Sequence, residues 1–245
     1  NQNAEKSANS RLFTRIPISA GDVLGRHRDG RFFDLTIVDL SLGETKAYIR
    51  NESYYSGQTG EPSKLFERDQ FDYFDEPLRS QIIDKSLRTV EPRGGSFTYD
   101  INGTAQGNWF KKGTRFLHPS WTEVDHLALV FDPVNPSQLR VSIGDGFKGE
   151  PKGTQWGVTD NMPAFSEVTA ESGPVAFELR KLGRCDSSTP PDPRLPEYYV
   201  LCNQDNSGTL LLQLVEDQSL QVEVFFGAPP QGEPEFTANS RIYVR

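Results

Sequence analysis

The sequence predicts an all-β protein in which a small β unit with one short helix precedes a larger β-sandwich or barrel. Turn-forming residues are frequent, with 21 Gly and 17 Pro in 245 residues. Sixteen Phe and eight Tyr supply bulk for a core. Helix-forming residues do not dominate any long stretch. An all-helical or disordered chain is therefore excluded.

The first part of the chain reads as a tail followed by a small β unit. Residues 1–11 are polar apart from isolated apolar side chains and predict a mobile tail. In residues 12–91 a turn at Gly21-Asp22 follows Ile16-Pro17-Ile18, and Phe33, Leu35 and Ile37 alternate with polar residues. This pattern is typical of short strands joined by tight turns.

One helix is expected after Asp75-Glu76-Pro77. These residues supply a cap and a proline for the first turn, and Leu78, Ile82, Ile83 and Leu87 form an apolar stripe.

Residues 92–245 are predicted to form strands separated by turns. They begin at Pro92-Arg93-Gly94-Gly95, where proline and glycine break any regular secondary structure. Residues 217–218 are expected to form the turn of a hairpin between two of these strands. The strands predicted are Ser96–Ile101, Gly107–Phe110, His126–Phe131, Leu139–Ile143, Val175–Leu182, Tyr198–Leu201, Thr209–Val215, Leu220–Phe226 and Arg241–Val244. So many short strands suit a sandwich or a barrel.

The two cysteines, Cys185 and Cys202, flank a proline-rich segment. A disulfide between them would close this loop and stabilise it by about 3 kcal/mol in the chain-entropy model. Two buried free thiols are the alternative, and the absence of a CxxC pair disfavours zinc or redox chemistry.

The net charge and the hydropathy of the chain argue against two classes of partner, nucleic acids and the membrane interior. The formal net charge is -8 and basic runs are short, which argues against a nucleic-acid-binding surface. No window approaches the roughly 20 apolar residues of a membrane-spanning helix. We therefore expect neither a nucleic-acid partner nor a membrane span.

Residues 16–25 (IPISAGDVLG) and 31–39 (RFFDLTIVD) resemble the second half of the LytM/M23 zinc endopeptidase fold. In that family a V-x-x-G-x-x-[IL]-G turn precedes a strand with a His-x-His metal pair. This chain has Phe32-Phe33-Asp34-Leu35 at that place, and a catalytic zinc needs about three protein ligands. The resemblance therefore implies a degenerate half-barrel without the zinc, and we expect no cofactor.

The rest of the chain resembles uncharacterised exported bacterial proteins that place a second β domain after this half-barrel. The resemblance lies in residues 71–74 (FDYF), 92–95 (PRGG), 99–110 (YDINGTAQGNWF), 126–130 (HLALV) and 236–243 (FTANSRIY). It implies an extracytoplasmic location, secreted or periplasmic, and brings no activity with it.

Five aromatic residues are candidate ligand-binding residues, because flat aromatic faces bind the apolar faces of sugar rings. They are Trp109, Trp121, Trp156, Tyr54 and Tyr55. The alternative is that the tryptophans fill the core, which suits Trp109 best because it lies on a predicted strand.

His118 and His126, with Asp125, form a weak candidate for a metal or acid–base site, because imidazole and carboxylate are suitable partners. A hydrogen-bonded histidine at a strand end is the commoner reading. No serine-hydrolase motif is present, so no catalytic residue is assigned.

We therefore expect a non-catalytic binding, scaffold or assembly protein of the cell envelope or extracellular space. A glycan or protein partner and self-assembly through exposed strand edges are both consistent with the sequence. The alternatives are a metal-dependent cell-wall hydrolase related to the M23 family and a carbohydrate-binding module.

Overall fold

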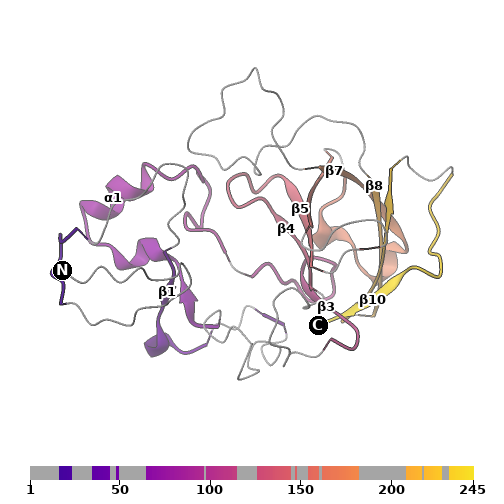
Figure 1. Ribbon diagram of the computed structural model, residues 1–245, viewed down its shortest axis with the longest axis horizontal. Helices are drawn as coiled ribbons and strands as arrows, with labels where there is room; N and C mark the ends of the chain where they lie inside the picture. The colour runs from indigo at the N-terminus through magenta and orange to yellow at the C-terminus, as the bar shows by residue number, and fades with distance from the viewer. Residues whose placement is uncertain are drawn as a thin grey trace, which may run out of the picture. The chain divides into compact units, whose positions relative to one another are not determined.

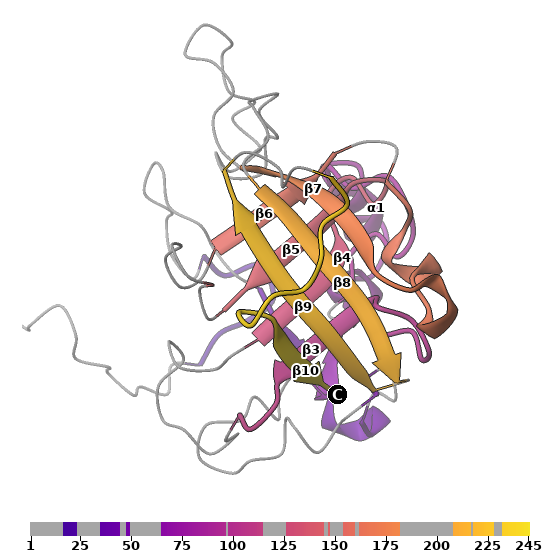
Figure 2. The same ribbon diagram turned by 90° about the vertical axis from the view of Figure 1, so that its right-hand side faces the viewer.

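Eight strands of the computed structural model close into an antiparallel barrel (Figures 1 and 2). The structure describes residues 17–23, 35–44, 48–49, 65–96, 98–114, 126–144, 147, 154–159, 162–181, 208–216, 218–227 and 232–245. By its contacts the chain divides into two units, residues 1–35 and 36–245. The barrel belongs to the second unit, and the predicted boundary at residues 91 and 92 stays a prediction.

The barrel strands follow one another around the barrel in chain order. They are β3 (Gly107–Lys111), β4 (His126–Phe131), β5 (Leu139–Ile143), β6 (Thr154–Val158), β7 (Val175–Lys181), β8 (Gly208–Glu216), β9 (Ser219–Phe226) and β10 (Arg241–Val244). Each strand pairs with the next, and β10 closes the barrel by pairing with β3, with Val244 opposite Phe110. The all-β class is thus confirmed, and of the two architectures expected the barrel is the one observed.

The barrel interior is filled by side chains, because alternate residues of every strand point to the same face. One continuous apolar cluster contains Trp109, Leu127, Leu129, Leu139, Val141, Ile143, Trp156, Val158, Phe177, Leu179, Leu210, Leu212, Leu214, Leu220, Val222, Val224 and Tyr243. Phe165, in the short 3-10 helix Phe165–Glu167, packs against Phe177 with ring centroids 5.0 Å apart. The inside of the barrel is therefore its core.

A buried arginine reinforces the barrel where its first and last strands meet. The Arg245 guanidinium is 4.0 Å from the ring centroid of Trp109 and donates to the carbonyl oxygens of Gln106, Ile101 and Thr104. Burial lowers the pKa of Arg245 to about 10, so the group still carries its charge at neutral pH. The loop before β3 is thereby tied to the end of β10.

A second buried charge lies between β4 and β5. Asp132 accepts hydrogen bonds from Nε and Nη2 of Arg140, the former at 2.9 Å, and both side chains are almost fully buried. The other carboxylate oxygen of Asp132 accepts from the backbone N–H groups of Val134 and Asn135, each at 2.8 Å. This carboxylate therefore shapes the turn as well as neutralising the arginine.

The remaining elements of the second unit are short. β1 (Ile37–Val38) pairs with β2 (Glu67–Arg68), and 3-10 turns cover Leu40–Leu42, Gln70–Tyr73 and Ala170–Ser172. Phe110 of β3 packs on its outer side against Tyr48 and Leu65, forming a small second core.

The helix α1 spans Leu78–Ile83, shorter than its apolar stripe predicts, and none of its residues is buried. It ends before Leu87. Backbone bonds at its end, from Lys85 to Ile82 and from Ser86 to Ile83, are of the 3-10 type, which tightens the last turn.

One strand prediction is wrong, and one observed strand is absent from the prediction. Residues 96–101 form no strand where the structure describes them, because the Asp100 carboxylate takes over the hydrogen bonding, accepting from the N–H groups of Asn108 at 2.7 Å and Ile49 at 3.1 Å. The strand missing from the prediction is β6, whose apolar alternation is limited to Trp156 and Val158, yet both of its neighbours pair with it. The predicted strand Tyr198–Leu201 lies outside the described residues.

Candidate functional site

The two described tryptophans among the predicted ligand-binding residues lie inside the barrel. Trp109 is fully buried and its Nε1 donates to the Ala105 carbonyl oxygen at 2.8 Å. Trp156 is also buried, with its ring centroid 5.8 Å from that of Phe226. Neither indole offers a free face to a ligand, so both belong to the core alternative. Trp121, Tyr54 and Tyr55 lie outside the described residues.

Of the three residues of the candidate metal or acid–base site, only His126 lies among the described residues. His126 begins β4, is half-buried, and packs edge-on against Phe110 with ring centroids 4.7 Å apart. His118 and Asp125 lie outside the described residues, as do the predicted disulfide partners Cys185 and Cys202. Within the described ranges no three His, Cys, Asp or Glu side chains gather in a way that could hold a metal ion.

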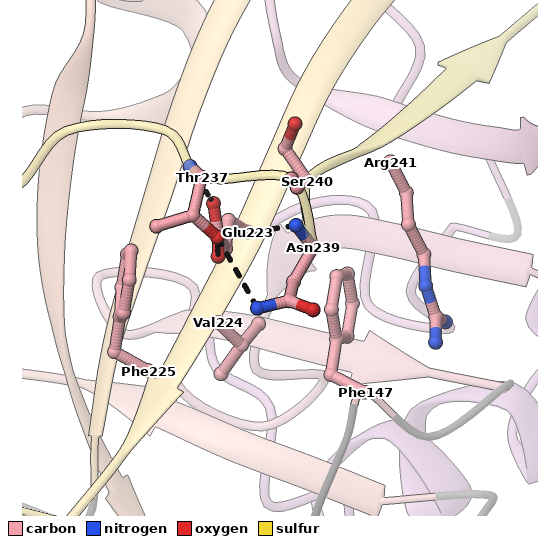
Figure 3. Close-up of a pocket in the computed structure, with 9 residues that line it drawn as sticks. Phe147, Glu223, Val224, Phe225, Thr237, Asn239, Ser240 and Arg241 are labelled. Atoms are coloured by element: carbon pink, nitrogen blue, oxygen red, sulfur yellow. Dashed lines mark hydrogen bonds between the residues drawn. The ribbon is translucent and has the colours of Figure 1, made fainter.

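A pocket on the outer surface of the barrel is a better candidate site. The segment Thr237–Ser240, which we call the strap, runs into β10. Figure 2 shows the chain before β10 crossing the outside of β8 and β9, and the hydrogen bonds of Thr237 and Ser240 place the strap itself over β9. Between the strap, β9 and Phe147 is a pocket of about 440 Å³, which we call the strap pocket (Figure 3). Its size is within the range of small-ligand sites.

Alternate residues of β9 hold the strap in place. Gln221, Glu223 and Phe225 share the outer face of this strand because successive side chains point to opposite sides. Gln221 Nε2 donates to Ser240 Oγ at 3.0 Å. Glu223 accepts from the backbone N–H of Thr237 at 2.7 Å and from its hydroxyl at 2.5 Å. The strap thereby covers Glu223, which is only 3% exposed.

The strap in turn presents polar groups to the pocket. Thr237 Oγ1 accepts from the backbone N–H of Asn239 at 3.1 Å and from its Nδ2 at 3.2 Å. In Figure 3 the side-chain oxygen of Asn239 points away from Thr237, on the side of Phe147. Thr237, Ala238 and Asn239 are exposed, so these groups are accessible to a ligand.

Aromatic rings and a cation complete the lining. The Arg241 guanidinium lies 4.4 Å from the ring centroid of Phe147, whose side chain is buried. Phe225 is half-buried and lines the pocket beside Val224. The pocket thus combines an aromatic surface with amide, hydroxyl and guanidinium groups, which can bind a small polar molecule that has an apolar face.

Sequence reasoning did not find this site. Glu223 fits the polar side of an alternating strand, and nothing local shows that another segment will cover it. The run Thr237-Ala238-Asn239-Ser240, three hydrogen-bonding side chains in four residues immediately before a strand, is the signal that was available.

Comparisons with known proteins identify no relative of this chain. No protein-family model, no curated protein and no solved structure matches this chain. Among the described residues no helix is both long and apolar enough to cross a lipid bilayer.

Proposed function

We propose that this protein is a non-catalytic, extracytoplasmic binding protein that recognises carbohydrate at the strap pocket. The observation that supports this most directly is the mixture of lining groups, in which Phe225 lies close to exposed side chains of the strap. Sugar rings have an apolar face that packs on aromatic rings and hydroxyl groups that need both donors and acceptors.

The filled barrel supports an outer site. Eight-stranded barrels are wide enough to hold either core side chains or one small ligand. Here the inward positions carry Trp109, Phe177, Tyr243 and many leucines. A ligand therefore binds more readily on the outer surface, where Asn239 and its neighbours are exposed.

Binding of oligosaccharides, measured on a glycan array and by calorimetry, tests the proposal. Phe225→Ala and Asn239→Ala should each weaken binding about tenfold, corresponding to the loss of one packing contact or one hydrogen bond. Val215→Ala, at an exposed apolar position of β8 outside the pocket, and Asn135→Ala, in an exposed turn, are matched controls that should bind normally. Absence of binding by the wild-type protein would refute the proposal.

The non-catalytic part of the proposal has its own test. The protein, supplied with zinc, is incubated with cell-wall material and simple glycans, and soluble products are measured with and without chelator. Chelator-sensitive turnover would favour the M23-like hydrolase instead.

Titration of thiols without reductant tests the proposed disulfide, since Cys185 and Cys202 should remain unlabelled if they are paired.

Self-assembly is the second candidate, and one observation favours it. The two-stranded ladder of β1 and β2 and the 3-10 turn after β1 expose apolar side chains. Val38 is 43%, Leu40 71% and Leu42 65% exposed. The argument from open edges does not extend to the barrel, whose described strands are all paired on both sides. Light scattering should give a dimer that Leu40→Asp converts to a monomer, and a monomeric wild-type protein would exclude this candidate.

A further inference from the structure

We infer that a hydrogen-bond chain from Glu223 through Thr237 to Asn239 fixes the polarity of the strap pocket, so that it selects a sugar that donates a free hydroxyl group to the Asn239 side-chain oxygen. The inference rests on the proposed carbohydrate binding and specifies its ligand. It places Glu223 and Thr237 as positioning residues and Asn239 as a residue that touches the sugar.

The hydroxyl group of Thr237 takes part in three hydrogen bonds. A threonine hydroxyl has one hydrogen and two lone pairs. The hydrogen is donated to Glu223, which as a carboxylate only accepts. The hydroxyl oxygen can then only accept, and it does so from the N–H and the Nδ2 of Asn239.

This arrangement assigns the two ends of the Asn239 side chain. An amide nitrogen only donates and an amide oxygen only accepts, so the nitrogen must be the end that faces Thr237. The oxygen is then left to face the pocket, as Figure 3 shows. Within the described part of the chain this oxygen receives no hydrogen bond from the protein, so it is an acceptor for a ligand.

Ser240 helps to hold the strap. Its Oγ accepts from Gln221 Nε2 at 3.0 Å, and in Figure 3 it points away from the side-chain oxygen of Asn239. The acceptor that the hydrogen-bond chain fixes is therefore the one on Asn239.

A sugar hydroxyl matches this acceptor, because a hydroxyl can both donate and accept. One hydroxyl donates to Asn239 Oδ1 while the apolar face of the sugar packs against the aromatic lining of the pocket. A group that only accepts, such as a carboxylate, cannot take the place of this hydroxyl.

The test compares matched sugars and matched variants. Calorimetry is carried out with a panel of gluco-, galacto- and manno-oligosaccharides and their monodeoxy derivatives. We expect members of the panel to bind, and removal of the hydroxyl that contacts Asn239 to weaken binding about tenfold, as expected for one hydrogen bond. Thr237→Val should weaken binding of the parent sugar by a similar factor, whereas Thr237→Ser, which keeps the hydroxyl, should bind within about threefold of wild type.

A nuclear magnetic resonance measurement separates positioning from loss of structure. The Asn239 side-chain proton that faces Thr237 should exchange with water more slowly in the wild type and in Thr237→Ser than in Thr237→Val, while the backbone spectrum of the barrel stays unchanged. Equal exchange in the wild type and in Thr237→Val would overturn the hydrogen-bond chain whether or not any sugar binds.

The outcomes of the binding experiment distinguish the two proposals. Sugar binding that is lost in Asn239→Ala but unchanged in Thr237→Val leaves carbohydrate recognition standing and overturns the polarity argument. Equal affinity for all of the deoxy sugars does the same. If the wild-type protein binds none of the panel, both proposals fail.

Discussion

Replacing Arg245 by methionine should lower the free energy of unfolding by about 1–4 kcal/mol. Methionine has a similar length and can still lie against Trp109, so the substitution removes the charge and the hydrogen bonds while preserving most of the volume. Arg245 is only 2% exposed, which means that solvent cannot replace the interactions that are lost.

The size of this loss depends on which other hydrogen bonds remain at the three carbonyl groups that accept from Arg245. The Ile101 oxygen also accepts from Thr104 N at 3.3 Å and from Thr104 Oγ1 at 2.9 Å, and the Gln106 oxygen also accepts from Ile101 N at 3.3 Å. The Thr104 oxygen has Arg245 as its only partner among the described residues, at 2.6 Å.

One carbonyl is thus left unsatisfied at a cost of about 1–3 kcal/mol, and the weakening of the other two costs about 1–2 kcal/mol. The lost cation–π contact adds about 2 kcal/mol for a desolvated pair. Burial of the guanidinium is unfavourable in the wild type, and its relief by about 3 kcal/mol in the variant reduces the total of about 4–7 kcal/mol to a net loss of about 1–4 kcal/mol.

The assay is urea unfolding followed by tryptophan fluorescence, with the slope of the transition compared between variants. Arg245→Lys is the matched control, because lysine keeps the charge but lacks the planar group that reaches several carbonyls and stacks on an indole. We expect it to fall between the wild type and Arg245→Met. If Arg245→Met lies within about 0.5 kcal/mol of wild type, the ordinary range for surface substitutions, the buried guanidinium does not stabilise the barrel.

Three further results are expected. Asp132→Ala, which leaves a buried arginine without its carboxylate and removes two backbone hydrogen bonds, should cost about 3–5 kcal/mol in urea unfolding, and a loss below about 1 kcal/mol would contradict this. Gly107→Ala should destabilise more than Gly173→Ala, since both have positive φ but only a Cβ at Gly107 would meet backbone, at 2.7 Å; equal melting temperatures would refute this. The carboxyl of Asp39 accepts hydrogen bonds from Ser41 and Tyr73, which lower its pKa to about 2; its contribution to stability should therefore be present above about pH 4 and be lost as the pH falls towards 2. Carbon-13 titration should show a higher midpoint in Ser41→Ala, and an unchanged midpoint would assign the low pKa to another cause.

Much of the barrel could be predicted because its strands carry their own local signals. β4, β5 and β10 begin and end where apolar alternation and turn residues place them, and the hairpin of β8 and β9 was expected from its turn. The local signal for β6 is limited to Trp156 and Val158, and so short a segment is stabilised as a strand by the neighbours that pair with it on both sides.

Closure of the barrel and the strap pocket depend on contacts between distant residues. No local pattern states that Val244 will lie opposite Phe110. Likewise, Glu223 looks like an ordinary outward-facing residue until Thr237 covers it, 14 positions further along. Local propensity cannot encode either event, which is why the fold class could be predicted and the site could not.

The pairing of β10 with β3 has a consequence for the nascent chain. While the protein is being synthesised, every strand from β3 to β9 leaves the ribosome before β10 does, so the sheet stays open at both sides until residues 241–244 are available. Such a growing sheet can pair with other chains, and its closing contact spans most of the domain, which slows folding. We therefore expect a chain truncated before Arg241 to aggregate or to depend on chaperones.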